Sequence, residues 1–90
     1  VIVMGTSEQL SFFVETSKSP NKGYMTLIRK LKQARKFRDL SQEELAAELG
    51  TTTGTISRWE NVKTTPSIYD FCCWANTLQI DVQLDLKRND

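Results

Sequence analysis

The side chains best suited to covalent or metal chemistry are scarce in this sequence. It contains no histidine, and its two cysteines, Cys72 and Cys73, are adjacent. Neighbouring cysteines cannot join distant segments, and two thiols without histidine cannot complete a four-ligand zinc site. We find no nucleophile constellation, no paired carboxylates and no phosphate-binding loop. The sequence therefore predicts no enzyme, no metal and no cofactor, and its cysteine usage is typical of a reducing cytosol.

Basic side chains are concentrated in the middle of the chain. The whole chain has a net charge of +1, but Met25 to Pro66 holds eight Lys or Arg and five Asp or Glu. The remaining residues include four basic and six acidic side chains. Such asymmetry is typical of a nucleic-acid-binding surface, although a basic run taken alone is more often a solvated helix face.

Length and hydropathy predict one small globular domain. Ninety residues are enough for one modest core, and a second subunit would add stability. No apolar run approaches the length of a membrane span, and the start lacks a signal-peptide pattern. We therefore expect a cytoplasmic protein without a membrane partner.

The pattern of residues divides the chain into three regions. Residues 1–24 form an arm in which Leu10–Thr16 is rich in β-formers and able to form a short strand, followed by a linker. Residues 25–80 have helical periodicity, and residues 81–90 form the end of a strand and a tail.

Four helices are predicted between residues 25 and 80. The first runs from about Met25 to Phe37. Ser41 and Glu44 are spaced as a capping box at the start of the second helix, which Gly50 ends. The third covers Thr53 to Glu60 after Thr52 as N-cap, and the fourth follows Ser67, with an apolar stripe of Ile68, Phe71, Cys72, Ala75 and Leu78.

A change of period after the fourth helix predicts a half-buried strand. Its alternating apolar residues are Ile80, Val82, Leu84 and Leu86. A single strand needs a partner, which is either the Leu10–Thr16 segment or the same strand of a second subunit. The second alternative predicts a homodimer.

The run from Leu40 to Glu60, LSQEELAAELGTTTGTISRWE, has the form of a helix-turn-helix. Here the chain resembles the Xre/Cro family of phage and bacterial repressors, from about Met25 to Ile80. The resemblance is carried by Arg35, Ser41–Ala46, Leu49-Gly50, Ile56-Ser57, Glu60-Asn61, Pro66-Ser67 and Leu78. It implies a mainly α, compact, four- to five-helix, lambda-repressor-like domain that binds double-stranded DNA.

The resemblance also implies roles for individual residues. Arg35 and Glu60 match an internal ion pair, whereas two exposed charges are the alternative. The third helix matches the recognition helix in the major groove, with base contacts from Thr53, Gly54, Ser57 and Arg58. Arg58 is suited to bidentate contact with guanine, and a phosphate contact is its alternative role. Gly54 allows close approach to DNA, or is merely tolerated near a helix start.

A second group of residues is expected to contact phosphates, which position a protein without reading sequence. Gln42 and Thr52 lie at helix N-termini, where backbone N–H groups attract anions, although Gln42 is also explained as an exposed first-turn residue. The full expected set is Gln42, Thr52, Asn61, Lys63, Thr64, Thr65, Lys36 and Arg38.

Two positions depart from the family pattern. Val62 stands where glycine is usual, so either Asn61 takes the left-handed conformation or the loop differs. Gln79 replaces a common glycine after the fourth helix, which predicts a different end for that helix.

Three functions are compatible with these features. The first is a transcriptional regulator, a repressor, that binds a pseudo-palindromic operator as a dimer. The second is an antitoxin of the Hip or Hig type that binds a toxin and regulates its own operon. The predicted strand after the fourth helix favours this function. The third is an interaction module that has lost DNA binding, which Gly54 and Val62 keep open.

Overall fold

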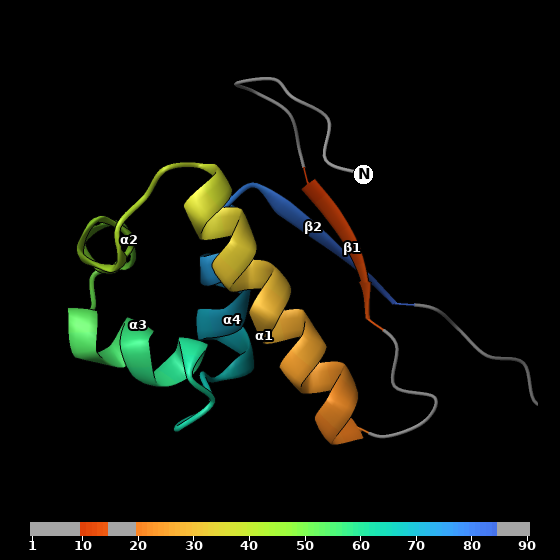
Figure 1. The fold of residues 1–90 in the computed structure, drawn as a ribbon. Helices are drawn as coiled ribbons and strands as arrows, with labels where there is room; N and C mark the ends of the chain where they lie inside the picture. The colour runs from red at the N-terminus through yellow and green to blue at the C-terminus, as the bar shows by residue number, and fades with distance from the viewer. Residues whose placement is uncertain (1–9, 15–19, 85–90) are drawn as a thin grey trace, which may run out of the picture.

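The computed structural model describes residues 10–14 and 20–84. Within them, one strand precedes four helices in the sequence and a second strand follows them (Figure 1). The elements are β1 (Leu10–Val14), α1 (Pro20–Phe37), α2 (Gln42–Leu49), α3 (Thr53–Glu60), α4 (Ile68–Thr77) and β2 (Ile80–Leu84). The predicted mainly α-helical domain with a strand at both ends is confirmed. None of the described helices has both the length and the apolar character needed to cross a membrane.

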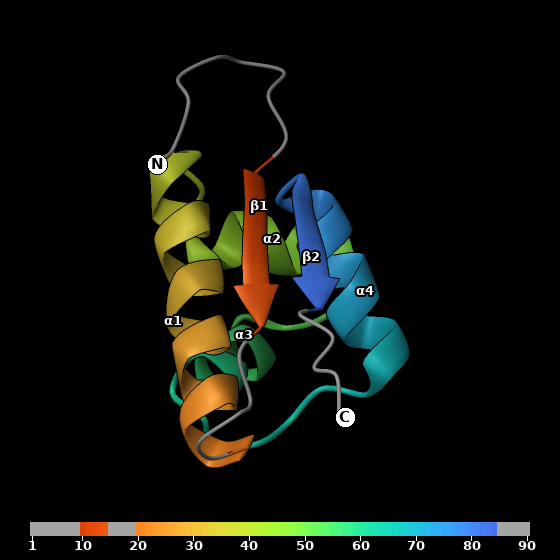
Figure 2. The same cartoon turned by 90° about the vertical axis from the view of Figure 1, so that its right-hand side faces the viewer.

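The two strands form a parallel pair, with Leu10 opposite Ile80 and Val14 opposite Leu84. A parallel pair needs a long crossover, and here all four helices provide it. Figure 2 shows β1 and β2 side by side between α1 and α4, with α2 and α3 behind them. The strand after α4 thus pairs with the N-terminal segment of the same chain. Leu86 and residues 15–16 lie outside the described part.

The hydrophobic core lies where the four helices meet. Its largest fully buried side chains are Trp74, Ile28, Leu31, Leu45, Ile56 and Leu78. Trp74 of α4 packs against Trp59 of α3, with ring centroids 5.4 Å apart and the rings tilted by 34°. This is a favourable arrangement for two aromatic rings, and it packs α3 against α4.

Two predicted details of the helices are wrong. α1 begins at Pro20 and not at Met25, because proline is well suited to the first turn of a helix. On α4, Ile68 and Cys72 are exposed and do not belong to the buried stripe. The large ring of Trp74 occupies the core instead, which turns the buried side of α4 away from both residues.

Local capping explains where α2 begins and ends. The Ser41 hydroxyl accepts from the backbone N–H of Glu44 at 3.0 Å, and the Glu44 carboxylate accepts from the N–H of Ser41 at 2.8 Å. Hydrogen bonds to the carboxylate from the backbone N–H and then from the hydroxyl of Ser41 stabilise its charged form and lower the pKa of Glu44. Gly50 ends the helix at φ 67°, so both sequence signals are confirmed.

The two departures from the glycine pattern have a simple structural outcome. Val62 itself adopts φ 57°, whereas Asn61 stays at φ −97°, and Gln79 also adopts φ 57°. Asn61 therefore does not take the left-handed conformation, and α4 ends in a left-handed turn without glycine. The backbone bonds from Val62 N–H to the Trp59 carbonyl and from Gln79 N–H to the Asn76 carbonyl hold these turns.

Replacing Val62 by glycine is expected to stabilise the protein. A left-handed conformation costs an L-residue about 1–2 kcal/mol, and glycine adds about 0.5–1 kcal/mol of unfolded-state entropy. Because the side chain of Val62 is 39% exposed, little packing is lost. We expect Val62→Gly to raise the free energy of unfolding by about 0.5–1 kcal/mol in urea titrations.

The matched control is Thr65→Gly in the same loop, where the backbone is not left-handed. This variant should be less stable than the wild type, because only the entropy cost applies. If Val62→Gly unfolds at a lower urea concentration than the wild type, the left-handed backbone of Val62 is not strained.

Candidate nucleic-acid interface

The third helix has one buried and one exposed side. Ile56, Trp59 and Glu60 are buried. Thr53, Gly54 and Arg58 are exposed and Ser57 is half-buried, so the four residues expected to contact bases lie together on the outer side. In Figure 1 this helix lies at the lower left of the domain, where its outer side is open to solvent.

A buried ion pair joins α3 to α1. Nε of Arg35 donates to Oε2 of Glu60 at 2.6 Å, and Nη2 donates to Oε1 at 3.1 Å. The Glu60 side chain is 0% exposed and that of Arg35 is 8% exposed. This is the ion pair implied by the family resemblance, and its two parallel bonds have the bidentate geometry that favours arginine over lysine. Arg35 is thus a structural residue.

The same pair extends to the start of α2. Nη1 of Arg35 donates to the Leu40 carbonyl at 2.7 Å, and the side-chain amide of Gln42 donates to Oε1 of Glu60 at 3.0 Å. One carboxylate therefore ties α1, the connector after it, the first turn of α2 and the end of α3. Sequence reasoning missed this bond of Gln42, because nothing local signals a partner eighteen residues away.

A small polar network surrounds the N-terminus of α3. The Thr52 hydroxyl caps the helix by accepting from Thr55 N–H at 3.2 Å, and the two threonine hydroxyls are 2.9 Å apart. Nη2 of Arg58 donates to the Thr55 hydroxyl at 3.3 Å. Thr55, which was not among the predicted site residues, thus links the cap to the guanidinium of Arg58.

Gly54 lies close to the end of the Arg58 side chain. A β-carbon at this position would lie 3.3 Å from Nη1 of Arg58 and 3.9 Å from the Thr52 hydroxyl. The Arg58 side chain therefore lies along α3 towards its N-terminus. Because the end of this exposed side chain is flexible, a small movement would admit a β-carbon, and the packing here does not require glycine.

The loop after α3 presents a second polar group. Asn61, Lys63 and Thr64 are exposed, and the backbone N–H of Lys63 bonds the Arg58 carbonyl at 2.8 Å. The Asn61 amide donates to the Ser57 hydroxyl at 3.3 Å. These predicted phosphate-contacting residues thus continue directly from the exposed side of α3.

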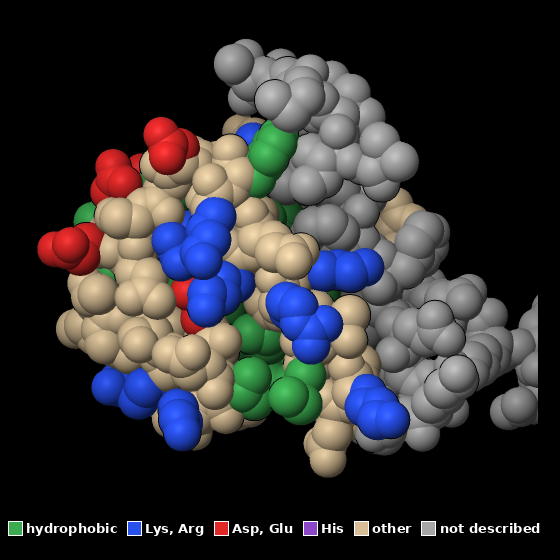
Figure 3. Space-filling view, in the orientation of Figure 1, with side chains coloured by type: hydrophobic (Ala, Val, Ile, Leu, Met, Phe, Trp, Pro, Cys, Tyr) green, Lys and Arg blue, Asp and Glu red, His purple; other side chains and the backbone are tan. Residues whose placement is uncertain are grey.

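Charge is unevenly distributed over the surface seen in Figure 3. Lys and Arg side chains extend from α3 at the lower left across the surface formed by α1, whereas acidic side chains gather at the upper left over α2. Lys36 near the end of α1 is exposed. Among residues 10–14 and 20–84 no group of three or more His, Cys, Asp or Glu side chains is placed to hold a metal ion.

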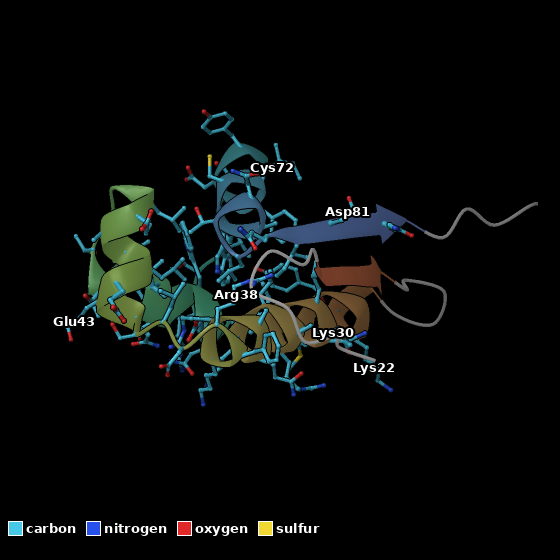
Figure 4. The ribbon with its side chains drawn as sticks, turned by 90° about the horizontal axis from the view of Figure 1, so that it is seen from above. Lys22, Lys30, Arg38, Glu43, Cys72 and Asp81 are labelled. Carbon is cyan, nitrogen blue, oxygen red and sulfur yellow. The ribbon has the colours of Figure 1, made fainter. Side chains whose placement is uncertain are left out.

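Arg38 has a different environment from Lys36. Its Nε donates to the carbonyl of Leu78, the residue that caps α4. The side chain is half-buried and lies between α1 and α4 in Figure 4. This contact joins the end of α1 to the turn before β2, so Arg38 takes part in the internal structure.

Comparison with known proteins identifies the family. The family model described as helix-turn-helix matches residues 31–84, more than half of the chain. The protein therefore belongs to the helix-turn-helix family of the Xre/Cro type, whose members are DNA-binding regulators. No curated protein and no solved structure matches the chain significantly.

Removing one partner of the buried ion pair should be severely destabilising. Glu60→Ala leaves the Arg35 guanidinium buried without its counter-charge, which costs roughly 3–5 kcal/mol. A domain of this size has a total stability of about 5–13 kcal/mol, so urea unfolding should shift strongly.

The double variant Arg35→Met/Glu60→Leu provides the matched comparison. It removes both charges together, and we expect it to lose clearly less stability than the sum of Arg35→Met and Glu60→Leu measured separately. Additive losses in this double-mutant cycle contradict a coupled pair.

Proposed function

We propose that the protein is a sequence-specific transcriptional regulator, a repressor, that reads the major groove of DNA with α3. The proposal rests on the difference between the buried side and the exposed side of α3. Its buried residues include the Glu60 anchor, whereas its outer side presents small and polar groups with one arginine. A rigidly anchored helix with an exposed polar side meets the requirement for reading base edges.

Within this proposal, Arg58 is the main base-contacting residue. Guanidinium pairs bidentately with O6 and N7 of guanine, and Thr53 and Ser57 are small enough to contact thymine or accept a hydrogen bond. The hydrogen bond from Arg58 to the Thr55 hydroxyl supports a pre-positioned Arg58. Because few long side chains project from α3, DNA shape at uncontacted positions should contribute to specificity.

Phosphate contacts in this proposal come from the end of α1 and from both ends of α3. Lys36, Thr52, Asn61, Lys63 and Thr64 are exposed around the outer side of α3 and supply donors or charge. Gln42 is half-buried and already bonded to Glu60, so we propose that it mainly supports the anchor at the edge of the phosphate-binding surface. Arg38, which bonds the end of α4, stays outside the proposed interface.

We also propose that two copies bind a pseudo-palindromic site with half-sites about one helical turn apart. Ile68 and Tyr69 support a contact between copies, because they are 80% and 75% exposed at the start of α4. Exposed apolar neighbours of this kind commonly mark an interaction surface. Saturation at two chains per operator duplex is the expected stoichiometry.

The proposed function can be tested by fluorescence anisotropy with a duplex selected from a random pool. We expect wild-type protein to bind the selected duplex at least about a thousandfold more tightly than random DNA. Arg58→Ala should cost about 1–3 kcal/mol on the selected duplex and little on random DNA. Lys63→Gln should weaken binding to both duplexes equally and lower the salt slope by about 0.9 per bound copy.

Asn76→Ala, an exposed change on α4, is the control and should bind like the wild type. Equal, weak binding of the wild type to both duplexes contradicts the proposed function. If Arg58→Ala instead weakens both duplexes equally, Arg58 is a phosphate contact and not a base contact.

A further inference from the structure

The first helix carries an unusual charge pattern. The 18 residues of α1 include six Lys or Arg and no Asp or Glu. One of the six, Arg35, is consumed by the buried pair with Glu60. The other five lie outside the buried core, and neutral residues such as Met25 and Gln33 share the exposed surface of α1 with them.

Most of these cations lie along one line of the helix. Lys22, Arg29, Lys32 and Lys36 are separated by seven, three and four residues, which places them on the same side of an α-helix. Lys22 and Arg29 are exposed, Lys32 is half-buried and Lys36 is exposed. In Figure 4, Lys22 lies on the side of α1 that is turned away from α4 and from the strands.

Within the described residues no carboxylate forms an ion pair with Arg29 or Lys32, and Lys36 lies near Asp39 and Glu44 without an ion pair to either. The side chains of Arg29, Lys32 and Lys36 form no ion pair or hydrogen bond within residues 10–14 and 20–84. Like charges three and four residues apart destabilise a helix, and no acidic residue of α1 compensates. A polyanion bound at this side would remove that repulsion.

The line of cations is continuous with the candidate interface. Lys36 lines a shallow surface hollow of about 410 Å³ together with Asp39, Leu40, Ser41 and Glu44, at the start of α2. From there the line runs back along α1, and Figure 3 shows Lys and Arg side chains across this surface as far as α3. From Lys36 to Arg29 the distance along the axis is about 10 Å, the length of about three base pairs.

We propose that the outer side of α1, formed by Arg29 and Lys32 with Lys22 and Lys36 at its ends, is a second phosphate-binding surface that contacts duplex DNA beside the segment read by α3. The inference rests on the proposed function of α3. Duplex DNA is favoured over other polyanions because this surface begins at the α2 terminus beside the recognition helix. Such contacts add affinity without reading sequence.

The test compares two duplexes that contain the same selected site. One ends at the site, and the other extends it by ten base pairs on each side. Wild-type protein, Arg29→Gln/Lys32→Gln and the charge-matched control Lys87→Gln/Arg88→Gln are titrated by anisotropy across a salt series. Glutamine is a good helix former, so thermal unfolding should find the first variant at least as stable as the wild type.

On the long duplex, Arg29→Gln/Lys32→Gln should lower the salt slope by about 1.8 per bound copy, which corresponds to two lost phosphate contacts in each copy. On the short duplex its affinity and slope should equal those of the wild type, and the tail control should behave like the wild type on both. If the salt slope of Arg29→Gln/Lys32→Gln equals that of the wild type on both duplexes, the inference is overturned, and an acidic protein or another polyanion becomes the alternative ligand. Equal loss on both duplexes, or an equal loss in the tail control, also overturns it.

Failure of the proposed function has a different signature in the same experiment. It appears as wild-type protein that does not prefer the selected site on the short duplex over random DNA of equal length. If the wild type prefers the selected site on the short duplex but Arg29→Gln/Lys32→Gln has no effect on the long duplex, only the α1 surface is refuted.

Discussion

The arrangement of this domain depends on satisfying one buried carboxylate. Glu60 is removed from water, and a buried charge is tolerated only when its partners are close and well oriented. Arg35 supplies two hydrogen bonds to it and Gln42 a third, while Arg35 also bonds the Leu40 carbonyl. Because these groups come from α1, the connector, α2 and α3, this pair and the core packing of Ile56 and Trp59 together fix the position of α3 relative to the start of α2.

This constraint separates the polar groups of the domain into two sets. The inner set, with Arg35, Gln42 and Arg38, is used to hold helices together. The outer set includes Arg58, which bonds only within α3, and Arg29 and Lys32 of α1, which form no ion pair or hydrogen bond within the described residues. An anchored helix with exposed polar groups on its outer side suits a surface that must meet DNA in one fixed orientation. In the proposed function, stability and recognition therefore depend on different residues of the same short helices.

The sequence predicted the parts of this structure that are decided locally. Caps such as Ser41 and stops such as Gly50 depend on a few neighbouring residues, so their outcome is visible in the chain. Contacts between residues far apart in the sequence were harder to predict. The structure alone showed the bond from Gln42 to Glu60 and the parallel pairing of the strands. Val62 shows a further limit, because it adopts the left-handed conformation, held by a local backbone bond to Trp59, even though glycine is absent.

The central claim is that the outer side of α3, held by the Arg35–Glu60 pair, is the DNA-binding surface. The most direct measurement is an amide chemical-shift titration of labelled protein with a selected duplex. The account predicts the largest changes at Thr53–Arg58, at the start of α2 and in the loop that contains Lys63, with small changes in β1 and β2. Changes confined to the strands or to α4, with α3 unaffected, would contradict it.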